Sequence, residues 1–112
     1  MEAYDLADLR AARAASGRLY HEFIRTHDLS VGVYVLPAGG TDSQRPHTED
    51  EVYYFLNGRA ALVVEGSRTD VGRGSVAFVA AGDDHRFVDI TEDLEVFVFW
   101  SPARHSNEPA AG

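Results

Sequence analysis

The stretch "QRPHTEDEVYYFLNG", residues 44–58, places polar and acidic side chains directly in front of a run of tyrosines and aliphatic residues. Residues separated by an even number along a strand point to the same face. His47 and Glu51 would therefore share a face, with Tyr53 and Phe55 following Glu51 inward. The intervening positions are also apolar or aromatic, which indicates a strand covered on both sides. The stretch predicts a buried strand that is preceded by polar residues, and we expect these residues to form a binding or catalytic site.

The segments on either side have the same strand-like character. They are short, rich in β-branched and aromatic residues, and separated by turn signals. We expect strands at 18–25, 29–36, 51–56, 59–66, 75–80, 85–90 and 94–100. Asn57-Gly58 predicts a tight hairpin because both residues tolerate positive φ. This spacing predicts an all-β fold, an antiparallel sandwich or barrel.

The two ends of the chain differ from this middle. Residues 5–16, "DLADLRAARAAS", are rich in helix formers, with Asp5 able to cap the start and Gly17 able to end the helix. The tail at 102–112 has two prolines and little to bury, so we expect it to be loosely held or used as an arm. The expected organisation is an N-terminal helix or arm over 1–17, a β-barrel over 18–101 and this tail.

Length and composition bound the function. A chain of 112 residues with 45% apolar and 25% charged residues is expected to fold as one globular domain. Its formal charge of −8, without a basic cluster, argues against nucleic acid as a partner. The N-terminus lacks the basic and apolar regions of a signal peptide, and no apolar run approaches the ~20 residues that span a bilayer. We expect a cytoplasmic protein that does not enter membranes.

A second stretch, "GRGSVAFVAAGDDHRFVD" at residues 72–89, delivers another imidazole at the start of a strand. In it His85 would share a face with Phe87 and Asp89. The chain has no cysteine, so any metal must be held by imidazole, carboxylate, amide or water. Two imidazoles and a carboxylate on neighbouring strands would suit a divalent ion such as Fe, Mn, Ni, Zn or Co and would leave positions open for substrate.

These two stretches resemble the two motifs of the cupin superfamily, which are small β-barrels. The first motif is Gly, five residues, His-x-His, three or four residues, Glu, six residues, Gly. The second is Gly, five residues, Pro-x-Gly, two residues, His, three residues, Asn. The matching positions are Gly39, His47, Glu51 and Gly58 in the first motif and Gly74, Gly82 and His85 in the second. The resemblance implies a double-stranded β-helix, or jelly-roll barrel, that binds one metal through residues of both motifs.

The departures from the motifs bear on the metal. Arg45 stands at the position of the first motif's leading histidine, and arginine is an obligate cation and a poor ligand. The amide oxygen of Gln44 could take that coordination position or hold a bound water. Arg45 could instead pair with an anionic substrate or simply be a solvated rim residue. Ala80 and Asp89 replace the proline and asparagine of the second motif, and neither is a ligand position.

The other polar residues have plainer interpretations. Glu49 and Asp50 are expected to form a solvated acidic rim, and His21, His27 and His105 to be surface or hydrogen-bonded residues. Even His47, Glu51 and His85 could be a relic cluster satisfied by water. Tyr53 is first a core residue, and it is also a candidate catalytic residue, as a phenol that donates a hydrogen bond or acts as an acid beside Glu51.

Three functions follow from this site. The first is a metal-dependent enzyme acting on a small organic molecule, as a dioxygenase, an isomerase or epimerase, or a lyase. The second is a non-catalytic module that binds a small ligand. The third is a metal-free barrel in which Glu51 and His85 form an acid and base pair and Arg45 orients an acid substrate. The apolar faces of residues 52–56 and 94–100 also predict a homodimer, a pairing common among cupins.

Overall fold

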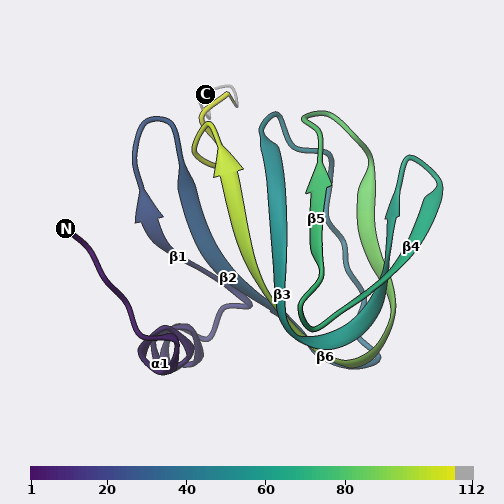
Figure 1. Cartoon of the computed structure of the whole chain (residues 1–112), viewed down its shortest axis with the longest axis horizontal. Coiled ribbons are helices and arrows are strands. Elements are labelled where there is room, and N and C mark those ends of the chain that lie inside the picture. Colours follow the sequence, from purple (N-terminus) through teal and green to yellow (C-terminus); the bar gives the residue numbers. More distant parts are fainter. Residues whose placement is uncertain (108–112) are drawn as a thin grey trace.

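A computed structural model of the chain describes residues 1–107, which form one helix and six strands (Figure 1). The helix is α1 (Leu6–Ser16), and the strands are β1 (Tyr20–Arg25), β2 (Ser30–Leu36), β3 (Asp50–Val64), β4 (Ser67–Gly72), β5 (Val76–Val79) and β6 (His85–Ser101). All strand pairs are antiparallel, in the order β1-β2-β6-β3-β4, and β5 pairs with β3. The expectation of an all-β fold with a short N-terminal helix is confirmed.

The two longest strands give the sheet its cup shape. The first part of β3 pairs with β5 and with the end of β6, whereas its last part pairs with β4 and with the start of β6. Both strands therefore turn from one wall of the barrel into the other, as Figure 1 shows at the bottom of the cup. The open end of the cup is where β3 begins and β6 both begins and ends.

The predicted hairpin at Asn57-Gly58 is wrong, because β3 runs through it without a turn. Gly58 does adopt positive φ, at 99°, but it does so at a bend where the pairing with β6 shifts register. An ideal Cβ at Gly58 would lie 2.6 Å from the Cα of Leu94, so only glycine allows the two strands to come this close. The two-residue turn falls instead at Glu65-Gly66, where both residues have positive φ, and it joins β3 to β4.

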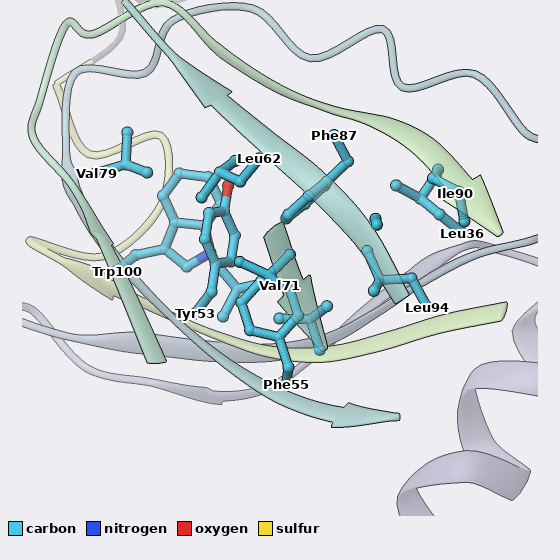
Figure 2. Packing of buried hydrophobic residues seen from close by; sticks show 13 residues of the cluster. Leu36, Tyr53, Phe55, Leu62, Val71, Val79, Phe87, Ile90, Leu94 and Trp100 are labelled. Atoms are coloured by element: carbon cyan, nitrogen blue, oxygen red, sulfur yellow. The ribbon is translucent and has the colours of Figure 1, made fainter. Parts of the chain in front are cut away.

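The barrel interior is filled by alternate residues of β3 and β6. Tyr53 and Phe55 are fully buried, as the alternation predicted, while Tyr54 faces outward. The ring of Phe87 lies edge-on to Phe55, with 5.8 Å between their centroids. Figure 2 shows the rings of Tyr53, Phe55 and Phe87 among the aliphatic side chains of the core. The core also contains Leu36, Leu62, Val71, Val79, Ile90, Leu94, Val96, Val98 and Trp100.

The helix and the tail attach to the outside of this barrel. Helix α1 follows Asp5 and ends at Gly17, which has the left-handed conformation that favours glycine, and Leu9 is its buried residue. The part of the tail at 102–107 is not loose, because Ala103 is buried and its neighbours are hydrogen-bonded to the barrel. The remainder of the tail, 108–112, lies outside the described residues. Within 1–107, no helix has the length and apolarity needed to cross a membrane.

Candidate metal centre

The side chains of His47, Glu51 and His85 meet at the open end of the barrel. Each offers one ligand atom, and these three atoms lie within 4.8 Å of one another. Glu51 is the second residue of β3 and His85 the first of β6, and both are almost fully buried. Long strands thus bring together two residues that are far apart in the sequence.

His47 reaches this group by a route that differs from the predicted one. It lies in the loop before β3, which begins only at Asp50, so strand alternation does not place it. The loop is held instead by the backbone of the second motif, because Gly82 N donates a hydrogen bond to His47 O at 2.6 Å. Gly82 has a φ of 82°, the left-handed conformation that favours glycine. The two motifs are therefore joined directly beside the site.

Three polar atoms in this group have no hydrogen-bond partner among residues 1–107. They are Oε1 and Oε2 of Glu51 and Nε2 of His85, and all are buried. Nε2 of His85 lies 3.2 Å from Oε1 of Glu51, which is close enough for an ion pair but lacks hydrogen-bond geometry. A buried carboxylate without a donor is costly unless a cation compensates it. The donor set therefore fits a divalent metal ion.

The orientation of His85 also suits a ligand. Its Nδ1 lies 2.9 Å from the carbonyl oxygen of Asp83, and since a carbonyl only accepts, Nδ1 must carry the proton. Nε2 faces Glu51, and a backbone hydrogen bond to the other ring nitrogen is the usual way in which a ligating histidine is oriented.

The two imidazoles are in electrostatically different surroundings. Burial lowers the pKa of His47, and the nearby His85 and Arg104 lower it further, although Glu51 opposes them. Burial also disfavours the charged form of His85, but the adjoining Glu51 carboxylate and the Asp83 carbonyl outweigh it, so the pKa of His85 is raised. The different shifts indicate that Glu51 is coupled more strongly to His85 than to His47.

Gln44 and Tyr53 lie beside this group and contact each other. The Tyr53 hydroxyl donates to Oε1 of Gln44 at 3.4 Å, and Nε2 of Gln44 donates to Oδ2 of Asp42 at 2.8 Å. The amide oxygen of Gln44 is thus directed toward Tyr53, and Gln44 as a metal ligand stays a prediction. Burial, with Glu51 nearby, raises the pKa of Tyr53 well above its usual value, which keeps the phenol protonated.

Two buried carboxylates near the site were not predicted. Asp42 accepts hydrogen bonds from Phe87 N at 2.8 Å and from Gln44, so it ties the first-motif loop to β6. Glu49 is 1% exposed and accepts from His105 N at 2.8 Å and from the Thr48 hydroxyl. The expected solvated rim is therefore wrong for Glu49, because the tail folds over it. No local sequence signal distinguishes these carboxylates from exposed ones.

Asp89 also departs from its expected position. It does not follow His85 inward but adopts a φ of 49° and lies on the surface, where its carboxylate pairs with Arg68 at 2.6 Å. Ile90 is the buried residue instead, because the register of the pairing between β3 and β6 shifts at this point.

A cavity of about 460 Å³ opens beside His47. Its walls include Tyr20, Tyr34, Gln44, Trp100 and the two arginines Arg45 and Arg104. His47 packs edge-on against Trp100, with 4.6 Å between the ring centroids. This volume is within the range of about 300–1,000 Å³ typical of small-molecule sites. A larger hollow of about 700 Å³ contains Gly58 and Arg68, but none of the three candidate ligands lines it.

Comparison with known proteins agrees with this barrel and its two motifs. A family model described as "Cupin domain" matches residues 32–101, and the chain belongs to the cupin family. The chain is 51% identical to the uncharacterized protein SCO3923 of Streptomyces coelicolor over 102 residues, which cover 91% of this chain and 97% of that protein.

Solved structures show the same fold at low identity. The TT1209 protein of Thermus thermophilus is similar with a TM-score of 0.72 and 22% identity, over 92% of this chain and 99% of that one. A Cupin 2 conserved barrel domain protein of Salinispora arenicola is similar with a TM-score of 0.71 and 23% identity, over 89% and 87% of the two chains. At such identity these structures establish the fold alone.

Proposed function

We propose that this cupin is a divalent-metal-dependent enzyme acting on a small organic substrate. One observation carries the proposal: three buried polar atoms of Glu51 and His85 have no hydrogen-bond partner among residues 1–107, and one ligand atom from each of these residues lies within 4.8 Å of one from His47. A cation would satisfy all three atoms at once. The fold supports the proposal as well, because both motifs contribute to the cluster.

In this proposal His47, Glu51 and His85 hold the ion. A bound divalent metal supplies Lewis-acid chemistry, which polarises a carbonyl or stabilises an enolate. Gln44 completes the ligand set or orients a water, and Tyr53 donates a hydrogen bond from its protonated phenol. The raised pKa of Tyr53 favours this role over that of a proton-transferring acid. Arg45 occupies the position of a further histidine in the motif, which limits the imidazoles in the set to two.

The ligand set by itself does not choose among a dioxygenase, an isomerase and a lyase, since a polarising metal serves all three. Iron content together with substrate-dependent oxygen uptake would favour the dioxygenase. A non-redox metal without oxygen uptake would favour the isomerase or lyase. Ligand binding without turnover would favour a binding module.

The first test is the metal content of the protein purified without an affinity tag, measured by elemental analysis. We expect near-stoichiometric metal in the native chain and its loss in both His47→Ala and Glu51→Ala. His27→Ala is the matched control, because His27 is almost fully exposed and lies outside the cluster. A native protein that contains no metal and takes up none on titration would rule out the metal centre. Activity that survives chelation would favour the metal-free acid and base pair of Glu51 and His85.

We also infer that the chain forms a homodimer through the outer face of β3, β5 and β6. Val76 and Phe78 on β5 are 67% and 62% exposed, and they pair across the sheet with Tyr54 and Val52 of β3. Phe99 of β6 is also exposed and pairs with Val52. An apolar face of this kind is typical of an isologous interface.

Light scattering coupled to gel filtration tests this association. We expect a dimer for the native chain and a monomer for Phe78→Glu. Leu29→Glu is the control, because Leu29 is an exposed apolar residue in the turn between β1 and β2. A monomeric native chain, or equal dissociation by both substitutions, would contradict the assigned interface.

A further inference from the structure

Arg104, in the tail that follows β6, has a guanidinium group for which residues 1–107 provide no ion-pair partner. Its Cζ lies 4.5 Å from the ring centroid of Tyr20 and 5.4 Å from that of Trp100, so the group is held against two aromatic faces. Its Nε is buried and has no hydrogen-bond partner among residues 1–107. No carboxylate in that part of the chain forms an ion pair with it. Such a group is available to bind an anion from outside the chain.

The backbone around Arg104 is fixed in place. Arg104 N donates to the buried hydroxyl of Ser30 at 2.9 Å, and Arg25 donates to Arg104 O at 3.0 Å. On either side, Ala103 is buried and His105 N is bound by the buried carboxylate of Glu49. These contacts hold the side chain at the cavity before any ligand arrives, which lowers the entropic cost of binding.

The cavity beside His47 has the opposite charge character from the rest of the molecule. The chain has 18 acidic residues and 10 lysines and arginines, yet the walls formed by residues 1–107 include Arg45 and Arg104 and no carboxylate. The Tyr20 hydroxyl accepts from Trp100 Nε1 at 3.0 Å and makes no other hydrogen bond among those residues, so its own proton can be donated to a ligand. Cationic groups and a phenol donor together favour an oxyanion.

We propose that Arg104 binds the oxyanion of a small acidic substrate, a carboxylate or a phosphate monoester, in the cavity beside the candidate metal centre. The planar guanidinium presents two parallel donors that match two oxygens of such a group. Tyr20, Tyr34 and Trp100 provide flat apolar walls for the rest of the molecule. His47 lines the same cavity and belongs to the metal cluster, so a substrate anchored at Arg104 extends toward the ion. This last point rests on the proposed metal-dependent function, whereas oxyanion binding itself does not.

The test uses the full chain freed of metal with a chelator, so that binding of the anion is separated from binding of the metal. Benzoate, phenyl phosphate and the neutral benzamide are titrated at constant ionic strength, with binding followed by amide NMR shifts. We expect the native chain to bind at least one of the two anions more tightly than benzamide. Preference for benzoate would assign a carboxylate, and preference for phenyl phosphate a phosphate ester.

Substitutions at Arg104 then locate the binding group. Arg104→Gln is expected to weaken anion binding by about tenfold or more, since a charged hydrogen bond is lost. Arg104→Lys keeps the charge without the planar fork and should recover part of the affinity. Arg73→Gln is the control, because Arg73 is exposed and lies outside this cavity. Circular dichroism and thermal unfolding verify that each variant is folded.

Several results would overturn the inference. The first is equal affinity of the native chain for benzoate, phenyl phosphate and benzamide. The second is no binding of either anion at millimolar concentration. The third is a folded Arg104→Gln variant that binds the anion as tightly as the native chain does. Loss of binding in Arg45→Gln but not in Arg104→Gln would also overturn it. Cobalt affinity measured on the same proteins separates the two proposals. Native chain that binds cobalt but no anion refutes only the oxyanion site, and the reverse result refutes only the metal centre.

Discussion

The ring of Tyr20 on β1 lies against the Cα of Gly32 on β2, although Tyr20 itself pairs with Tyr34. An ideal Cβ at Gly32 would be 2.5 Å from Cε2 of Tyr20, closer than any side chain tolerates. In this position the Tyr20 hydroxyl accepts a hydrogen bond from Trp100 Nε1, and the ring lies beneath the guanidinium of Arg104. A glycine in the interior of a strand marks such a close approach. Gly32 therefore makes room for one wall of the cavity.

Gly32→Ala is expected to destabilise the fold by about 1–3 kcal/mol, because the added methyl forces the Tyr20 ring to move. Urea unfolding measures this free energy. In a Tyr20→Ala background the same substitution should cost much less, since the clashing ring is gone and the two residues are coupled. Equal costs in both backgrounds would show that the close approach does not determine the requirement for glycine.

Gly58→Ala is expected to cost more, about 3 kcal/mol or above, because positive φ and a backbone clash act together. The obstructing atoms belong to the backbone of β6 at Asp93 and Leu94 and cannot rotate away. Gly74→Ala is the matched control, with a φ of 86° and open space around the added Cβ. Thermal and urea unfolding of both variants give the comparison. A cost for Gly58→Ala no larger than that for Gly74→Ala would contradict the clash.

Gly58 also shows which part of the fold the sequence could predict. Alternation from Glu51 to Phe55 predicted the buried face of β3, because that pattern depends on neighbouring residues alone. Asn57-Gly58 indicated positive φ correctly at Gly58 but not at Asn57, and it predicted a hairpin instead of a bend. A turn and a bulge both use such a residue, and the choice between them depends on pairing with β6, which is distant in the sequence.

In the candidate site, too, one part was predictable from the sequence and another part was not. His47, Glu51 and His85 were predicted to come together because each stands at a motif position with fixed spacing to the strands. The burial of Glu49 and the position of Arg104 at the cavity were not predicted. Both environments arise only where the first-motif loop, β2 and the tail pack together. Burial of a loop carboxylate or placement of a tail arginine is a long-range property, and local patterns do not encode it.

Added divalent metal is expected to stabilise the chelated protein, because an ion bound by the native state alone lowers its free energy. At about 100 times the dissociation constant the gain is about 2.7 kcal/mol. Unfolding of the metal-free chain with increasing Mn²⁺ or Co²⁺ measures this gain. Glu51→Gln should lose most of it, because a neutral amide replaces the buried carboxylate, whereas His27→Ala should keep it. The same stabilisation in Glu51→Gln would contradict ligation by Glu51.

The cavity wall should also make folding sensitive to high pH. Burial raises the pKa of Tyr20 to about 12 and that of Tyr34 to about 12, compared with 10.0 for an ordinary tyrosine. The folded state thus favours the protonated phenols, and this contribution to stability is full below pH 10 and is lost as the pH rises toward 12.

Phenolate absorbance followed against pH measures this ionisation directly. In the folded chain, Tyr20 and Tyr34 should ionise later than in the urea-unfolded chain, and Tyr20→Phe should remove one late-ionising phenol. The same variant loses the acceptor for Trp100 Nε1, so its stability near neutral pH is expected to fall by about 1 kcal/mol. If Tyr20→Phe removed an early-ionising phenol instead, burial of the Tyr20 side chain would not raise its pKa as stated.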